Sequence, residues 1–119
     1  ARRDNIEVMG EIPNDKVNEL LENAHILVNT SKHEGFSNTF IQAWMRRVPV
    51  ISLNADPDAI LKRKEIGYCS GSFIKLVQDT ERLISDNAER ENMGARAREY
   101  AIKNYSWDNM DKILKILAN

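Results

Sequence analysis

Apolar residues along the chain fall into two alternating patterns, short unbroken runs and longer stretches in which they recur every three or four positions. An unbroken run predicts a strand covered on both faces, and the second spacing predicts a helix with one apolar face. Strands are therefore expected at 6–9, 26–30, 50–53 and, very short, at 68–70. Helices are expected at about 14–24, 38–47 and 58–65, and then from 73 to 118.

This alternation of strands and helices predicts right-handed βαβ units and a parallel sheet. We expect an α/β fold, a partial Rossmann-like doubly wound sheet of three or four strands with helices on both faces and further C-terminal helices. No repeat, low-complexity tract or linker divides the sequence, so residues 1–119 are expected to form a single domain. Such sheets bind ligands beyond the carboxyl ends of their strands, where the segments 31–37 and 54–58 lie.

The composition of the chain excludes several classes of protein. Hydrophobic residues make up 42% and charged residues 29% of the chain, as in ordinary soluble domains. The formal net charge of −1 gives no electrostatic case for binding nucleic acid or an anionic membrane. The apolar runs are far shorter than the roughly 20 residues that span a bilayer. With one cysteine and two histidines no Cys/His metal site is expected, and Cys69 is expected to be a small buried apolar residue.

The segment 31–44, SKHEGFSNTFIQAW, carries the candidate chemistry. Gly35 permits a tight turn and a close approach of a ligand to the backbone. The next helix begins near Asn38, where free backbone amides and the helix dipole attract phosphate and other anions. Glu34 offers a carboxylate ahead of the turn, and Gln42 shares a helix face with Asn38 at i+4. These groups together suit the sugar, ribose and phosphates of a nucleotide sugar.

Each of these residues also has a plain structural explanation. A single glycine is common between a strand and a helix, Glu34 could cap the helix or pair locally, and Gln42 could face solvent. His33 could act as a general base, but a lone histidine in a loop is more often exposed. Phe40 and Trp44 are expected in the core because they have the spacing of an apolar helix face. The residue types alone therefore leave the function open.

The complete string is more specific, because it resembles the donor-binding motif of retaining glycosyltransferases of the GT-B fold, the family-four-like or group 1 glycosyltransferases. In that family a strand is followed by Ser, by Glu-Gly-Phe and by a helix that ends before Pro-Val and another apolar strand. The matching positions are Ser31, 34–36, Ala43 and 49–52, with further matches at 8–10, 17–29, 93–98 and 105–107. The resemblance covers nearly the whole chain.

The resemblance implies a role for each matching position. Glu34 takes the place of the family's first motif Glu, which contacts the donor sugar and stabilises charge near the anomeric centre, and is the candidate catalytic residue. Gln42, eight positions later, takes the place of the second Glu, which accepts hydrogen bonds from the ribose hydroxyls. The other donor-binding positions are Gly35, Phe36, Ser37 and Asn38. No metal and no cofactor are implied, because the nucleoside-diphosphate sugar is a substrate.

The sequence departs from the family pattern at two positions. Gln42 lacks the charge that strengthens carboxylate–hydroxyl hydrogen bonds, so ribose binding is expected to be weaker or rearranged. The segment 46–48 stands where the family usually has a small residue or Gly, and we interpret it as a local loop variation. The family's diphosphate-binding Arg and Lys come from an upstream Gly-rich loop whose spacing Arg2 and Arg3 do not match.

The implied parent protein is a glycosyltransferase, a hexosyltransferase, of which residues 1–119 are the nucleotide-sugar-binding domain, truncated on its N-terminal side and inactive alone. Its partners would be the nucleotide-sugar donor and a glycan or lipid-linked acceptor held by a missing N-terminal domain, and not nucleic acid. Such enzymes are commonly cytoplasmic, in some cases peripherally attached to the membrane, and serve polysaccharide or glycolipid biosynthesis. Two other functions stay open, a non-catalytic scaffold or interaction module, which Gln42 favours, and a nucleotide-sugar epimerase.

Overall fold

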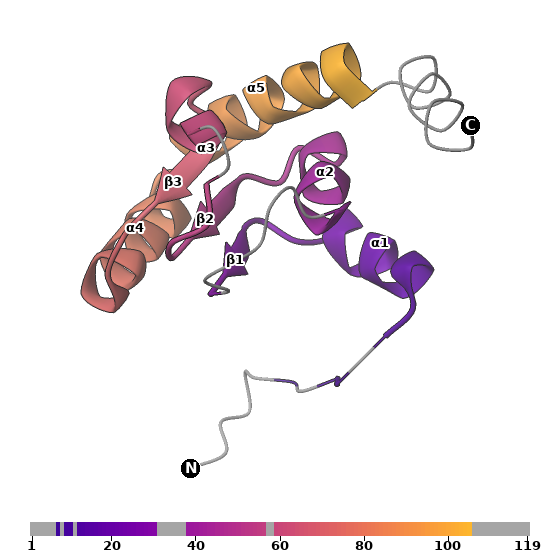
Figure 1. The fold of residues 1–119 in the computed structure, drawn as a ribbon, viewed down its shortest axis with the longest axis horizontal. Helices are drawn as coiled ribbons and strands as arrows, with labels where there is room; N and C mark the ends of the chain where they lie inside the picture. The colour runs from indigo at the N-terminus through magenta and orange to yellow at the C-terminus, as the bar shows by residue number, and fades with distance from the viewer. Residues whose placement is uncertain (1–6, 8, 11, 31–37, 57–58, 106–119) are drawn as a thin grey trace, which may run out of the picture.

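The computed structural model describes residues 7, 9–10, 12–30, 38–56 and 59–105 (Figure 1). In chain order the elements are α1 (Asn14–Glu22), β1 (Leu27–Asn29), α2 (Asn38–Met45), β2 (Val50–Ser52), α3 (Ile60–Arg63), β3 (Gly67–Cys69), α4 (Phe73–Ser85) and α5 (Asn87–Tyr105). Strands and helices alternate up to β3 and two helices follow, so the predicted α/β class is confirmed.

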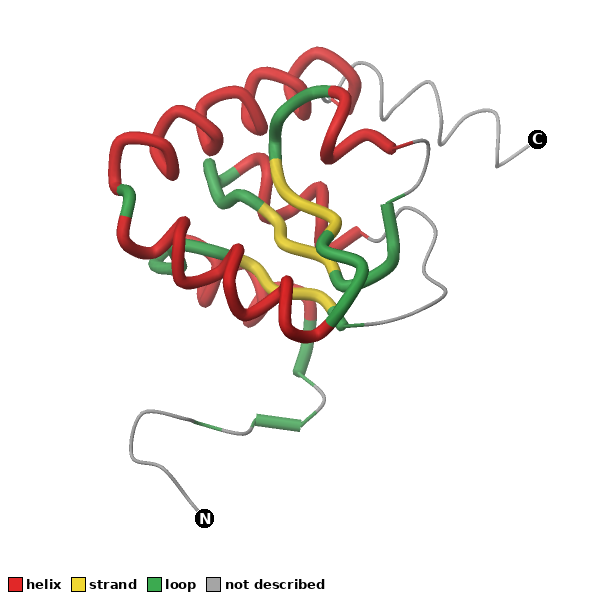
Figure 2. Tube along the Cα trace, turned by 90° about the vertical axis from the view of Figure 1, so that its left-hand side faces the viewer, coloured by secondary structure: helices red, strands yellow, loops and turns green. Residues whose placement is uncertain are grey.

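The three strands form one parallel sheet in the order β1-β2-β3. In this register Val50 of β2 lies between Leu27 of β1 and Gly67 of β3. All residues of β2 are buried, as its apolar run predicts for a central strand. Helices lie on both sides of the strands (Figure 2), which gives the partial Rossmann-like arrangement expected from the sequence.

One face of the sheet, which we call the α2 face, carries the larger apolar core. Leu27 and Val50 point to this face, and α1, α2, α3 and α5 cover it. Its buried side chains are Leu21, Phe40, Ala43, Trp44, Val48, Val50, Ile60, Leu61, Ile66, Ala97 and Ala101. Trp44 lies between the rings of Phe40 and Tyr100 in edge-to-face contacts, with ring centroids 6.1 and 5.5 Å away. The expectation that Phe40 and Trp44 belong to the core is confirmed.

The opposite face, which we call the α4 face, has a smaller core. Its buried members are Ile51, Leu76, Leu83 and Met93, with the partly buried Ile26, Leu53 and Tyr68 packed against them. Polar contacts fix the turn between β3 and α4. The buried carboxylate of Asp79 accepts hydrogen bonds from Ser70 Oγ at 2.7 Å and from Lys75 Nζ at 2.8 Å. The start of α4 is thereby tied to the carboxyl end of β3.

Helix α2 ends in a left-handed turn at Arg47, whose φ is 61°. The turn is closed by hydrogen bonds from Arg47 N to Trp44 O at 3.0 Å and from Val48 N to Ala43 O at 2.9 Å. This is the Schellman pattern, in which the left-handed residue is most often Gly. The arginine that departs from the family's small residue therefore occupies the turn that terminates α2.

Helix α5 packs directly on this turn. Gly94 lies against the carbonyl group of Arg47, so closely that a Cβ atom at position 94 would overlap the carbonyl oxygen. Four residues later, Arg98 Nη1 donates to Met45 O at 2.6 Å. The C-terminal end of α2 is thus held by both the backbone and a side chain of α5.

Several sequence predictions of burial and extent are wrong. Glu7 and Met9 lie outside any strand, because the described residues offer no neighbouring strand for their backbone groups, while residues 6 and 8 lie outside the description. Val28 is exposed rather than covered on both faces, because β1 is an edge strand over which α4 does not extend. Cys69 is exposed because it ends the other edge strand, β3.

The long C-terminal helical region also differs from the prediction in its burial. Of the apolar residues of α4, Leu76 and Leu83 are buried, whereas Phe73, Val77 and Ile84 are exposed. The predicted helix at 106–118 lies outside the described residues. Among the helices that are described, none combines the length and apolar character needed to cross a membrane.

Candidate functional site

The candidate site lies at the carboxyl ends of β1 and β2, on the side of the sheet where α2 begins. β1 ends at Asn29, α2 begins at Asn38, and the segment between them starts and finishes at this edge. The candidate residues Glu34, Gly35, Phe36 and Ser37 belong to that segment and lie outside the described residues. Their flanks are nevertheless placed at the edge of a parallel sheet where ligands bind in folds of this kind.

The first turn of α2 contributes backbone amides to this edge. Helix α2 begins at Asn38 and continues to Met45, and the first N–H groups of a helix have no partner within it. These amides point toward the carboxyl edge, and the helix dipole adds a partial positive charge there. The described part of the site can therefore stabilise a negatively charged group without a basic side chain.

Gln42 is the candidate site residue whose side chain the structure describes. It is half-buried one turn into α2, and its Oε1 atom is shielded from solvent without a hydrogen-bond partner. Its backbone carbonyl accepts a hydrogen bond from Arg46 Nη1 at 3.1 Å. A shielded acceptor that finds no donor among the described residues is costly, and such groups in native proteins call for a specific explanation. The alternative prediction that Gln42 faces solvent is therefore wrong for its Oε1 atom.

Two polar residues at the same edge were not singled out by the sequence. Asn29 Nδ2 donates to Ser52 Oγ at 3.3 Å, joining the last residues of β1 and β2. Ser52 is fully buried. Both side chains point to the α2 face, since they share the alternation of Leu27 and Val50. The sequence signal that could have identified these residues is that a polar residue ends each of two apolar strands. Their hydrogen bond fixes the relative position of the two strand ends.

The second predicted loop, 54–58, is described up to Asp56. Asp56 Oδ1 accepts a hydrogen bond from Leu61 N at 2.8 Å, which holds the start of α3. Burial, with a smaller contribution from the nearby Asp56 carboxylate, raises the pKa of the Cys69 thiol. Asp56 therefore holds the start of α3, and the raised pKa favours the protonated form of the Cys69 thiol.

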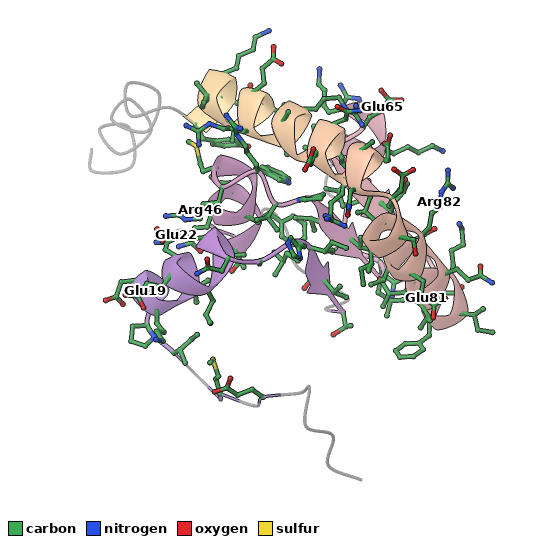
Figure 3. All side chains as sticks on the ribbon, turned by 180° about the vertical axis from the view of Figure 1, so that it is seen from behind. Glu19, Glu22, Arg46, Glu65, Glu81 and Arg82 are labelled. Carbon is green, nitrogen blue, oxygen red and sulfur yellow. The ribbon has the colours of Figure 1, made fainter. Side chains whose placement is uncertain are left out.

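A cavity of about 440 Å³ opens on another side of the molecule, along the free side of β3. It is lined by residues of both charges, among them Lys62 of α3, Glu65 in the turn after α3, Arg82 of α4 and Arg96 of α5, and by Asp56. Figure 3 labels Glu65 and Arg82 on this side. Gln42 does not line the cavity, whereas Asp56 of the second predicted loop does.

The described residues hold no cluster of three or more His, Cys, Asp or Glu side chains that could bind a metal ion. In the described part, the site consists of helix amides, an unpartnered amide oxygen and a bonded Asn–Ser pair. Such groups can bind and orient a polar, anionic ligand. The described groups include no acid or base positioned for proton transfer, and the candidate carboxylate of Glu34 lies outside them.

Comparison with known proteins identifies the family of this chain. Residues 2–100 match the family described as glycosyl transferases group 1. The glycosyltransferase 1 domain-containing protein 1 of Xenopus tropicalis is 26% identical over 106 residues, which are 88% of this chain and 31% of that protein. The chain thus spans about a third of the length of this curated relative. No solved structure matches the chain. Since the family match covers most of the sequence and includes the whole segment 31–44, the chain belongs to the group 1 glycosyltransferases.

Proposed function

We propose that this chain is the donor-binding part of a retaining glycosyltransferase of the GT-B fold. The parent enzyme transfers a hexose from a nucleoside-diphosphate sugar to an acceptor hydroxyl on a glycan or lipid-linked acceptor. The acceptor is bound by an N-terminal domain that these residues do not include, and neither a metal ion nor a cofactor takes part. The family supports glycosyl transfer in general, and the donor class, the retention and the hexose belong to the proposal.

The observation that carries the proposal is the unpartnered oxygen of Gln42 beside the start of α2. In the proposed complex, the amides of the first turn and of Gly35, Phe36 and Ser37 hold diphosphate oxygens and sugar hydroxyls, with Asn38 beside them. Gln42 Oε1, one turn along the same helix, accepts a hydrogen bond from a ribose hydroxyl. The ribose thereby supplies the donor that Oε1 lacks in the structure.

The chemical role in this proposal falls to Glu34. Its carboxylate lies at the donor sugar and stabilises the positive charge that develops at the anomeric carbon as the bond to the diphosphate breaks. The helix amides stabilise the negative charge of the leaving diphosphate, which is the larger contribution because these dipoles are fixed before the reaction. In this proposal the Arg and Lys that bind the diphosphate come from an upstream Gly-rich loop, as the resemblance to the family implies.

Donor binding to the full-length polypeptide tests the binding part of the proposal. Isothermal titration with UDP, GDP and their glucose and mannose conjugates should identify one nucleotide that binds. Gln42→Ala should weaken that binding by about 3- to 10-fold, the value of one neutral hydrogen bond, and Gln42→Glu should strengthen it. Glu81→Gln, an exposed carboxylate on α4 (Figure 3), is the control and should bind as the parent does.

Transfer assays test the chemical part. Glu34→Gln should retain donor binding within a few fold and lower kcat by about 10² or more, the scale of losing one electrostatic stabiliser. Chelation of metal ions should leave the rate unchanged. No donor binding and no transfer by the full-length protein would make it the scaffold or interaction module instead. Consumption or inversion of the donor sugar without an acceptor would make it the epimerase.

A further inference from the structure

A groove of about 490 Å³ lies on the surface of α5, beside the turn that ends α2. Its lining residues on α5 are spaced so that they share one face of the helix. They are Ala95, Arg98, Glu99, Ile102 and Lys103, and Arg47 of the α2 turn completes the lining. We call this feature the Arg47 groove. It brings three cationic side chains and one carboxylate together, on a chain whose net charge is −1. The groove is therefore a local concentration of positive charge.

The structure holds Arg47 in a backbone conformation that arginine rarely adopts. Its φ of 61° belongs to the left-handed region, which Gly enters without the steric cost that a Cβ atom brings. The two hydrogen bonds that close the turn come from the backbone N–H groups of Arg47 and Val48, and a glycine at position 47 would keep both. The turn itself therefore does not explain why position 47 is an arginine. Backbone strain of this kind is concentrated at functional sites, including ligand clamps.

Arg98 is fixed in place at the same groove. Its Nη1 atom donates to Met45 O at 2.6 Å, which anchors the guanidinium at the end of α2. A guanidinium has five N–H donors, so this bond leaves others for a ligand. Arg47 and Arg98 are exposed, and among the described residues neither forms an ion pair with a carboxylate, including Glu99 in the lining. The positive charge of these two side chains is therefore available to an anion.

Two guanidinium groups at one groove suit a phosphate group. Their planar N–H forks match the geometry of phosphate oxygens, and arginine keeps its charge at every physiological pH. Lys103 adds a further cation to the lining. Ala95 and Ile102, which is 46% exposed, give the groove an apolar part. The groove can therefore bind a phosphate group together with an apolar portion of the same molecule.

The Arg47 groove and the candidate site lie at opposite ends of α2. The candidate site is at the start of the helix, whereas Arg47 follows its last residue and precedes β2. We propose that the Arg47 groove binds the phosphate group of a phosphorylated ligand, supplied either by a soluble phosphate ester or by the headgroup of an anionic phospholipid. This inference does not rest on the proposed function, because a ligand in the groove leaves the start of α2 free.

Isothermal titration of the full-length polypeptide with inorganic phosphate and with glycerol 3-phosphate tests the groove. Arg47→Gln should weaken the binding by about 10-fold or more, the scale of losing a charge-assisted hydrogen bond. Arg82→Gln is the matched control, because it removes the same charge from an exposed residue of α4 (Figure 3) outside this groove, and should bind as the parent does. Arg47→Gly should lose the binding as well, and a folding defect would not explain the loss because Gly suits the left-handed turn.

Vesicles distinguish the two sources of the phosphate group. If the ligand is a lipid headgroup, the parent protein should sediment with vesicles of phosphatidylcholine and phosphatidylglycerol but not with phosphatidylcholine alone, and Arg47→Gln should abolish this binding. Binding of the soluble probes without vesicle binding identifies a phosphate ester instead. The proposal is overturned if the parent binds neither the soluble probes nor the anionic vesicles. It is also overturned if Arg47→Gln and Arg82→Gln weaken binding to the same degree, or if binding survives both Arg47→Gln and Arg47→Gly.

Discussion

The α2 face and the α4 face of this sheet are covered to different degrees. Four helices close the α2 face around Trp44 and Val50, and β1 and β2 contribute Leu27 and Val50 to that side. On the α4 face one helix and Met93 of α5 cover Ile51, while Val28 on the neighbouring strand stays exposed. The chain thus completes one side of the sheet with its own residues and leaves part of the other side open.

The two faces therefore differ in role. The α2 face holds most of the packing that stabilises this chain, and the α4 face leaves apolar side chains exposed. Helix α2, with the unpartnered oxygen of Gln42, belongs to the closed face and packs there against α1, β2 and α5. Of the candidate site residues that the structure describes, none lies on the open face. A candidate binding site on a well-packed helix is positioned precisely enough to select a ligand, because its side chains have few alternative arrangements.

Trp44→Ala tests the comparison with the largest expected effect. It removes a fully buried ring and its edge contacts with Phe40 and Tyr100, and should lower the free energy of unfolding by about 3–5 kcal/mol. Urea denaturation of the 119-residue chain, followed by far-UV circular dichroism, measures this loss. Phe73→Ala, at an exposed position of α4, should stay within about 0.5 kcal/mol of the parent. Equal losses for the two variants would refute the contrast between the faces.

Gly94→Ala addresses the contact between α5 and the end of α2. At a solvent-facing helix position this change stabilises by up to about 1 kcal/mol, because Ala is the better helix former. Here the new methyl group meets the carbonyl of Arg47, and we expect a loss of about 1–3 kcal/mol instead. Urea denaturation shows whether the substitution lowers or raises the free energy of unfolding, and we expect it to be lowered. A gain in stability would mean that α5 does not press on this turn.

Much of this fold follows from local sequence patterns. The strands at 27–29, 50–52 and 67–69 and the helices α1 to α4 were predicted within a few residues, because apolar periodicity is a property of the segment itself. Burial was harder to predict. Val28 belongs to a run that was expected to be covered on both faces, yet it is exposed, since a sequence records that a side chain is apolar but not which part of the protein covers it.

The candidate site was predictable in position but not in detail. The alternation of elements placed segments 31–37 and 54–58 at the carboxyl edge, and the ends of both are found there. The Asn29–Ser52 hydrogen bond and the shielded oxygen of Gln42 depend on the register of β1 with β2 and on the packing around α2. Neither is encoded in residue spacing. The roles of Glu34, Gly35, Phe36, Ser37 and Asn38 stay predictions.

Arg47→Gly tests the closed face with a substitution that should stabilise the chain. Arg47 holds a left-handed conformation that costs a residue with a Cβ about 1 kcal/mol or more relative to Gly. The substitution should therefore raise the free energy of unfolding by up to about 1 kcal/mol in urea denaturation. Arg63→Gly, inside α3, is the control and should lower it, because Gly is a poor helix residue. A loss for Arg47→Gly would mean that the arginine side chain makes a contact worth more than the backbone strain.

The smallest effect is expected at Cys69, which ends the edge strand β3. Burial, and to a lesser degree Asp56, raises the pKa of its thiol, so the folded state favours the protonated form. The corresponding stabilisation is complete below the ordinary thiol pKa of about 8.5 and is lost as the pH rises through the folded pKa. Alkylation of Cys69 at pH 8 should be slower in the folded chain than in urea, and its pH midpoint should be higher. Asp56→Asn keeps the acceptor for Leu61 N and should lower that midpoint part of the way, whereas Asp86→Asn, at the far end of α4, should leave it unchanged. A folded thiol that reacts as fast as the unfolded one would show that its surroundings at the end of β3 do not protect Cys69.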